Sequence, residues 1–133
     1  MTLFIDTDVI LDTLLIREPH FSSSVAIMVL ADKHKCCTSV HGLLNVHYFT
    51  KKKFGEQQAR KAIEVLSTKL TVIAETKEFI DKALLSAISD FEDAVQFYSA
   101  KSVGADAIIT RNLQDYKQST IPVYTPNQFL KTL

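Results

Sequence analysis

The chain has 133 residues, 47% of them hydrophobic and 23% charged, and its 15 basic residues are balanced by 15 acidic ones. This length and composition predict one globular domain spanning residues 1–133 and exclude a low-complexity chain. The neutral balance argues against a protein that binds nucleic acid through a general excess of basic residues, although it does not exclude a nuclease with few, local basic groups.

The beginning of the chain and its cysteines favour a cytoplasmic protein. An acid, Asp6, arrives before an apolar signal region could form, and no long apolar run follows, so we expect neither a secretory signal nor a membrane span. Cys36 and Cys37 are adjacent and fit a reducing compartment. Zinc binding by His34, Cys36 and Cys37 is an alternative, but no fourth ligand has zinc-site spacing, so a half-buried strand is favoured.

Short apolar runs alternate with helical patterns along the chain. We expect strands at residues 3–5, 36–38, 70–74, 107–109 and 122–124. We expect helices at residues 9–16, 24–34, 39–53, 56–67, 77–88, 89–104 and from 125 onward. The expected helix ends are a cap within residues 22–24, Gly55, a capping box from Ser89 to Glu92, Gly104, and Pro126 in a first turn.

This alternation predicts the fold class. Apolar strands separated by helices form a parallel sheet that is covered on both faces. We therefore expect a three-layer α/β/α domain with a central, mostly parallel sheet of about five short strands. Pro122 places the last strand at an edge of the sheet, because proline cannot donate a ladder hydrogen bond.

Polar residues follow the expected strands, and sites in open α/β sheets lie beyond the carboxyl ends of the strands. These residues are Asp6 and Asp8 after the first strand, Asn45 on the helix after the second, and Thr110, Arg111, Asn112 and Asp115 after the fourth. Asp90 and Asp93 share a face of the helix before the fourth strand. Carboxylates gathered there would repel one another, and a divalent cation removes that repulsion. Oxygen ligands favour Mg²⁺ or Mn²⁺ over zinc.

Several of these acids also have purely structural explanations. Asp90 fits a helix cap at least as well as a metal ligand, and Asp8 could cap the helix that begins at Val9. Asp12 could lie in solvent or pair with Arg17, and Asp115 could belong to a turn. Asp6, at the end of a buried strand, and Asp93, followed by Ala-Val, have the weakest structural explanations.

Four segments in order resemble the PIN domain, a nuclease fold found in many bacterial toxins. They are FIDTDVILD, TSVHGLLNVHYFTKK, DFEDAVQFYSAKSVGADAIITRNLQDY and IPVYTPNQFL, and they cover nearly the whole chain. The third segment is the most specific match. The resemblance implies metal-dependent cleavage of RNA, a homodimer and an antitoxin partner.

The resemblance also implies roles for individual residues. The family's first acid falls on Asp6, its third on Asp93, and its fourth region on Asn112 and Asp115. The second acid, usually glutamate, falls on Asn45, which supplies no charge, and Asp8 and Asp90 could partly compensate. Asp6, Asp93 and Asp115 would then hold the metal.

The same resemblance suggests how RNA would be held. Thr110 or Asn112 would orient a water or a phosphate oxygen. Arg111 would contact the RNA backbone. The lysines at 51–53 are favoured as a solvated helix end, with RNA contact as a second use.

Two alternative functions remain open from the sequence. FIDTDVIL also fits the Asp-x-Asp opening of haloacid dehalogenase-type phosphatases, and CCTS is similar to their second motif. Their acidic pair should follow a strand directly, however, and the chain leaves no room for a cap domain. The other alternative is a weakened nuclease fold that only binds RNA or a protein partner, which Asn45 would explain.

Overall fold

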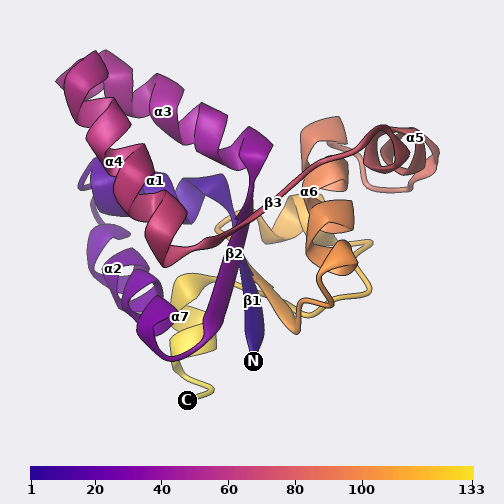
Figure 1. Cartoon of the computed structure of the whole chain (residues 1–133). Helices are drawn as coiled ribbons and strands as arrows, with labels where there is room; N and C mark the ends of the chain where they lie inside the picture. The colour runs from indigo at the N-terminus through magenta and orange to yellow at the C-terminus, as the bar shows by residue number, and fades with distance from the viewer.

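A computed structural model describes residues 1–133 and contains one parallel sheet between two layers of helices (Figure 1). Its strands are β1 (Thr2–Ile5), β2 (Lys35–Ser39), β3 (Thr71–Ile73), β4 (Ala107–Ile109) and β5 (Val123–Tyr124). Their order in the sheet is β3-β2-β1-β4-β5, and every neighbouring pair is parallel. The predicted three-layer α/β/α fold with five short strands is confirmed, and β5 lies at an edge as Pro122 indicated.

Two unequal groups of helices cover the two faces of the sheet (Figure 1). The α-helices are α1 (Thr7–Leu14), α2 (Phe21–Val29), α3 (Val40–Phe54), α4 (Glu56–Lys69), α5 (Lys77–Leu85), α6 (Phe91–Ser102) and α7 (Pro126–Leu130). Short 3₁₀ helices lie at η1 (Leu30–Asp32) and η2 (Leu113–Tyr116). Helices α1 to α4 and α7 pack on one face, and α5 and α6 pack on the other. No helix combines the length and hydropathy that crossing a bilayer requires.

The strands contribute side chains alternately to two hydrophobic cores. Leu3 and Ile5 point into a cluster of 16 buried residues under the larger helical layer. Phe4, between them, points into a cluster of 11 residues under α5 and α6. Cys36 and Cys37 are split between the two cores in the same way and are both free thiols. A strand buried on both faces therefore explains the continuous apolar runs in the sequence.

Two of the expected helix caps are wrong. Helix α2 begins at Phe21 without a side-chain cap, and the buried hydroxyl of Ser24 donates to the carbonyl of Phe21 at 2.9 Å instead. Helix α6 is capped by Asp90, whose carboxylate accepts from the backbone N–H of Asp93 at 2.9 Å, and not by Ser89. The start of a helix depends on which nearby oxygen reaches the free N–H groups, and several residues here could do so.

Other expected helix ends are confirmed. Gly55 ends α3 with a φ of 90°, a conformation that favours glycine. Gly104, with a φ of 64°, follows the end of α6. Helix α7 begins with Pro126 and has a complete capping box between Thr125 and Gln128.

The register of the central strands places the ends of β1 and β4 side by side. Ile5 pairs with Ile109, and the N–H of Asp6 donates to the carbonyl of Ile109 at 3.0 Å. Asp6 and Thr110 therefore leave the sheet as immediate neighbours. Ser39, at the end of β2, lies on the other side of β1. This edge of the sheet is where the candidate site forms.

Candidate active site

Asp6 directly follows β1 and is the N-cap of α1. Its carboxylate therefore binds the backbone at the start of α1 and also belongs to the candidate site. It is 5% exposed and accepts three hydrogen bonds: from the N–H of Thr7 at 2.7 Å, the hydroxyl of Thr110 at 2.8 Å and the hydroxyl of Tyr116 at 3.3 Å. Burial raises the pKa of Asp6, and these hydrogen bonds oppose that rise. Capping alone therefore does not account for this residue.

Asp8 lies in the first turn of α1 and is directed at the loop after β4. Its Oδ2 accepts from the backbone N–H of Arg111 at 3.0 Å, whereas its Oδ1 is buried without a hydrogen-bond partner. Burial, followed by the charge of Asp6, raises the pKa of Asp8 to about 7. The alternative that Asp8 caps a helix is wrong, because α1 begins at Thr7 and Asp6 is its cap.

Asp93 reaches the same place from the first turn of α6. Its half-buried carboxylate has its pKa raised to about 8, first by burial and then by the charges of Asp6, Asp90 and Asp115. Asp115, from η2, lies near enough to Asp93 to raise the pKa of Asp93. The structure therefore brings together Asp6, Asp93 and Asp115, as the sequence predicted. Asp90 is exposed and serves as the cap of α6.

Tyr116 occupies the centre of this carboxylate cluster. Its side chain is 2% exposed, and its hydroxyl lies 3.3 Å from Oδ2 of Asp6 and 3.5 Å from Oδ1 of Asp93. Burial and the nearby carboxylates raise the pKa of this phenol well above its usual value. Sequence reasoning did not assign Tyr116 to the site. Its place directly after Asp115 was the available signal.

Thr110 and Asn112 are linked to Asp6 and Asp8 by hydrogen bonds. Thr110 is fully buried, and its hydroxyl lies 2.8 Å from Oδ2 of Asp6 and 3.4 Å from Oδ2 of Asp8. The backbone N–H of Asn112 donates to that hydroxyl at 3.0 Å, and Asn112 is otherwise exposed. The loop after β4 thus fixes Asp6 and Asp8 relative to each other.

Asn45 faces the first turn of α6 from α3. Its side-chain amide donates to Oε1 of Glu92 at 3.0 Å and lies 3.1 Å from Nε2 of His41. Glu92 lies directly before Asp93, and its charge contributes to the raised pKa of Asp6. Sequence reasoning missed Glu92 because it was interpreted only as part of a capping box.

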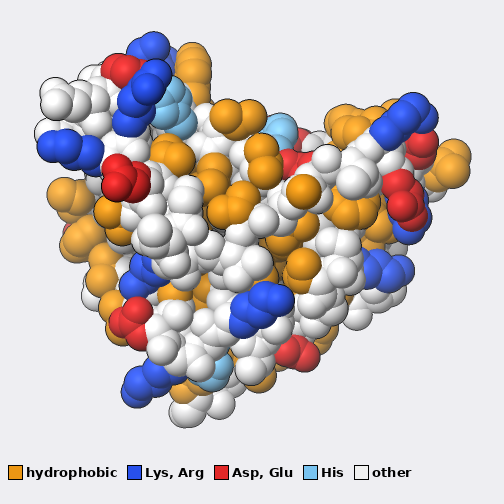
Figure 2. All heavy atoms as spheres, viewed as in Figure 1, with side chains coloured by type: hydrophobic (Ala, Val, Ile, Leu, Met, Phe, Trp, Pro, Cys, Tyr) orange, Lys and Arg blue, Asp and Glu red, His pale blue; other side chains and the backbone are white.

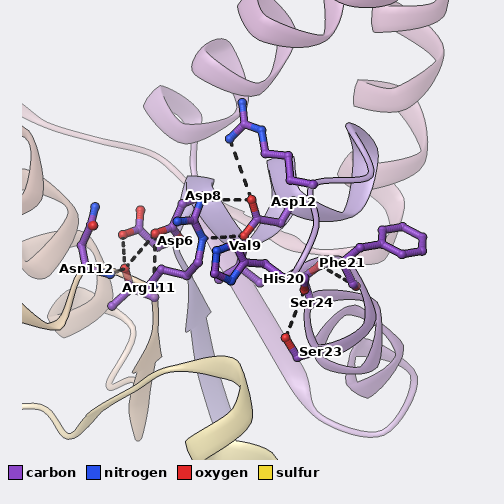
Figure 3. A network of polar contacts seen from close by, with 12 residues as sticks. Asp6, Asp8, Val9, Asp12, His20, Phe21, Ser23, Ser24, Arg111 and Asn112 are labelled. Carbon is purple, nitrogen blue, oxygen red and sulfur yellow. Dashed lines mark hydrogen bonds and ion pairs between the residues drawn. The ribbon is translucent and has the colours of Figure 1, made fainter.

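Arg111 has a structural role that the sequence did not indicate (Figure 3). Its Nε and Nη2 donate to the two carboxylate oxygens of Asp12 at 2.6 and 3.1 Å. Asp12 is fully buried, and Arg17 lies 3.9 Å from it. The alternative that Asp12 lies in solvent is wrong, and its expected pairing with Arg17 is the longer of its two ion pairs. Contact between Arg111 and RNA stays a prediction.

The donor set is suited to a hard divalent cation, but its spacing is not that of a formed metal site. All the candidate ligands are oxygens, and one buried oxygen of Asp8 has no partner. No group of three or more His, Cys, Asp or Glu side chains has the geometry of a metal site. The hydroxyl of Tyr116 lies within hydrogen-bonding distance of both Asp6 and Asp93.

Basic groups do not form a single patch on the face of the molecule in Figure 2. Figure 2 shows Lys and Arg side chains scattered over the face in view, with hydrophobic side chains around a notch between two lobes. The lysines at 51–53 are exposed in the last turn of α3, where they complement the helix dipole. Lys53 also donates to the carbonyl of Leu15 at 2.9 Å.

One protein family and several solved structures are similar to this chain. A family model described as "PIN domain" matches residues 2–114. A sequence comparison with curated proteins finds no match. A toxin–antitoxin complex from Klebsiella pneumoniae is similar in structure, with a TM-score of 0.70, 22% identity, and coverage of 95% of this chain and 98% of that one.

Two further solved structures show the same likeness. VapBC2 from Rickettsia felis, bound to a DNA fragment from its promoter, has a TM-score of 0.70 and 15% identity, and covers 94% of this chain and 98% of that one. VapC20 from Mycobacterium tuberculosis, described as a sarcin–ricin loop cleaving toxin, has a TM-score of 0.65 and 20% identity, with coverage of 80% and 86%. At these identities the likeness establishes the fold alone.

Proposed function

This chain belongs to the PIN-domain family, and we propose that it is a ribonuclease that uses Mg²⁺ or Mn²⁺ to hydrolyse RNA phosphodiester bonds. The observation that carries the proposal is the meeting of Asp6, Asp93 and Asp115, from three distant parts of the chain, at the carboxyl end of the sheet. Burial raises the pKa values of Asp6 and Asp93, and neighbouring carboxylates raise them further, so a divalent cation would offset negative charge at this site.

In this proposal Asp6, Asp93 and Asp115 would hold the metal. The cation would supply a bound water of lowered pKa and would offset the charge that develops on the phosphate. Thr110 holds Asp6 in place through its 2.8 Å hydrogen bond. Asn112 fixes Thr110 through its backbone, which leaves its exposed side chain free to bond a phosphate oxygen. The hydroxyl of Tyr116, which donates to Asp6 at 3.3 Å, would compete with a cation for that oxygen.

Arg111 is the proposed RNA contact nearest to the carboxylates. Two of its guanidinium nitrogens are bound to Asp12, which leaves Nη1 for a phosphate. Its side chain is 31% exposed. The lysines at 51–53 are a second proposed contact.

We further propose a toxin role with a protein antitoxin, and a homodimer. The toxin–antitoxin complex from Klebsiella pneumoniae supports the antitoxin partner. An antitoxin or a second copy of this chain would bury exposed apolar side chains on binding. On α3 they include Leu44 and Tyr48, and on α5 they include Leu84 and Leu85, which are 67%, 55%, 68% and 90% exposed respectively.

The test combines metal binding with cleavage. Thermal unfolding of the wild type should shift upward with millimolar Mn²⁺, because a ligand that binds the folded state stabilises it. Cleavage of a labelled single-stranded RNA should require the metal. Asp6→Asn and Asp93→Asn should abolish cleavage and the thermal shift while the protein stays folded. Asp81→Asn, at an exposed acid on α5, is the control and should change neither.

Two results would contradict the proposal. One is an unchanged midpoint at saturating Mn²⁺ together with no cleavage, which would favour a module that only binds RNA or protein. The other is release of phosphate from a small phosphomonoester with no RNA cleavage, which would favour the phosphatase. Asp90 and Asp93 lie at the start of α6 and not at a strand end, which argues against the phosphatase arrangement.

A further inference from the structure

A polar cavity of about 280 Å³ lies beside Arg111, between the starts of α2 and α7. Five of its six lining residues are polar and none is acidic; they are His20, Ser23, Arg111, Thr125, Pro126 and Asn127. Figure 3 shows that His20 lies next to the pair formed by Arg111 and Asp12. Arg111 follows β4 and Thr125 follows β5, so the cavity lies at the carboxyl edge of the sheet, where open α/β sheets bind their ligands. It shares no lining residue with the carboxylate cluster.

The guanidinium group of Arg111 gives this cavity a positive charge in a fixed position. Its Nε and Nη2 donate to the buried carboxylate of Asp12 at 2.6 and 3.1 Å, whereas its Nη1 has no partner in the protein. Arg17 lies 3.9 Å from the same carboxylate, so two guanidinium groups share one carboxylate and one positive charge remains. A guanidinium held in one orientation is suited to a phosphate, because its planar set of N–H groups matches the phosphate oxygens.

Hydrogen-bond donors from two helices line the rest of the cavity. Neither the imidazole of His20 nor the side-chain amide of Asn127 makes a hydrogen bond within the protein. The hydroxyl of Thr125 accepts from the N–H of Gln128 at 3.2 Å, so its own proton is still available. Helix α2 has no side-chain cap, and the backbone N–H of Ser23 is left without an acceptor. Donors and a positive charge, with no acid among them, are complementary to an anion that only accepts hydrogen bonds.

We propose that this cavity binds a phosphate group of the RNA strand, distinct from the phosphate at the carboxylates. That the phosphate belongs to RNA rests on the proposed ribonuclease function. The cavity is smaller than the roughly 300–1,000 Å³ of pockets that enclose a drug-sized ligand, so it suits a small group such as phosphate and not a whole nucleotide. A phosphate held here would fix the strand on the sheet edge without any metal ion.

Asn127→Asp tests the proposal with a nearly isosteric change that adds a negative charge to the cavity. An acid in the first turn of α7 is compatible with that helix. Binding of a short labelled single-stranded RNA is measured in EDTA, where the proposed metal-dependent cleavage does not occur. We expect the variant to bind RNA about fivefold more weakly, the effect of two unit charges about 4 Å apart in water. The slope of log affinity against log salt should flatten by about 0.7, the value for one phosphate contact on a single strand.

A control and a second variant separate a local effect from misfolding. Gln57→Glu makes the same change, from an amide to an acid, at an exposed residue in the first turn of α4, away from the cavity. It should bind RNA as the wild type does. Ser23→Asp places an acid in the cavity from the first turn of α2, where the helix dipole favours it, and should weaken RNA binding as Asn127→Asp does. Urea unfolding shows which variants fold, and Ser23→Asp decides the matter if Asn127→Asp does not.

Two further probes identify the source of the phosphate. Inorganic phosphate, added at constant ionic strength, should compete with RNA for the wild type more strongly than for Asn127→Asp. The RNA is also compared with and without a terminal phosphate. A preference for the phosphorylated strand that Asn127→Asp abolishes assigns the cavity to a terminal phosphate. Equal binding of the two strands, with both weakened in Asn127→Asp, assigns it to an internal phosphate.

The outcomes distinguish this inference from the function on which it rests. If Asn127→Asp and Ser23→Asp bind RNA as well as Gln57→Glu does, or if the wild type binds no RNA in EDTA, the inference is overturned. The proposed function still stands in that case, provided that the wild type cleaves RNA with Mn²⁺ and Asp93→Asn does not. If the two cavity variants weaken RNA binding but the wild type cleaves no RNA with Mn²⁺, the phosphate cavity stands and the proposed function fails.

Discussion

The hydroxyl of Tyr116 lies 3.3 Å from Oδ2 of Asp6, although 110 residues separate the two along the chain. The same hydroxyl lies 3.5 Å from Asp93, so a single neutral donor stands between the two most important carboxylates of the proposed site. Without a cation, this phenol moderates the repulsion between them. In a metal-bound site it would compete with the cation for the same oxygens.

Tyr116→Phe should therefore have opposite effects with and without metal. In EDTA the variant should lose about 1 kcal/mol of stability, the usual net value of a lost hydrogen bond. Mn²⁺ should bind roughly fivefold more tightly, because that hydrogen bond no longer has to break. Urea unfolding in EDTA and a Mn²⁺ titration measure the two effects. Equal or weaker Mn²⁺ binding would show that the hydroxyl does not compete with the metal.

Stability without metal should fall as the pH rises from about 4 to about 8. In the unfolded chain, carboxyls such as Asp8 and Asp93 ionise near their usual pKa of 3.8, whereas in the fold their pKa values are about 7 and about 8. Between these limits the folded state binds more protons than the unfolded state, so each rise in pH favours unfolding. Urea unfolding in EDTA at several pH values measures the slope.

The raised pKa values of Asp8 and Asp93 also determine how stabilisation by Mn²⁺ depends on pH. Mn²⁺ has to displace protons from raised-pKa carboxyls, so its stabilisation should increase up to about pH 8 and then level off. Asp93→Asn is the control, since removing this group should flatten both the EDTA profile and the Mn²⁺ profile. Identical pH profiles for wild type and Asp93→Asn would mean that Asp93 has an ordinary pKa.

Arg111→Ala should destabilise the fold by about 3 kcal/mol, because it leaves the fully buried Asp12 without its bidentate partner. Arg111→Lys should cost less, since a lysine keeps the charge but cannot make both bonds. Arg60→Ala is the matched control: Arg60 is 77% exposed beside Glu56, and its loss should cost no more than about 0.5 kcal/mol. Equal losses for Arg111→Ala and Arg60→Ala would contradict this account of the buried pair.

Gly42→Ala should lower stability even though alanine is the better helix former. A Cβ at position 42 would lie 3.0 Å from Oγ1 of Thr38 and 3.2 Å from Oγ1 of Thr7, both of which are buried. The gain in helix propensity is about 1 kcal/mol, and overpacking a buried site costs about 1–3 kcal/mol. We expect a net loss of about 1 kcal/mol in urea unfolding. Adding Thr38→Ala should recover part of it, and a stabilised Gly42→Ala would show that the two threonines move aside.

Much of the fold could be predicted from local patterns. The strand at Ala107–Ile109, the end of α3 at Gly55 and the start of α7 at Pro126 all lie where the sequence placed them. Each depends on interactions within a few residues, such as apolar side chains in sequence, a positive φ or a proline in a first turn. The start of α6 was wrong by contrast, because Ser89 and Asp90 are both capable caps and local chemistry does not choose between them.

The sequence by itself determined the fold class and the set of acids, because apolar runs alternating with helices leave few arrangements and strand ends converge on one edge of a parallel sheet. Only the tertiary structure decided what surrounds those acids. Tyr116 between Asp6 and Asp93, Arg111 on Asp12 and Asn45 on Glu92 are all pairs from distant segments. Their distances depend on how helices and loops pack over the sheet, and no spacing along the chain encodes that packing.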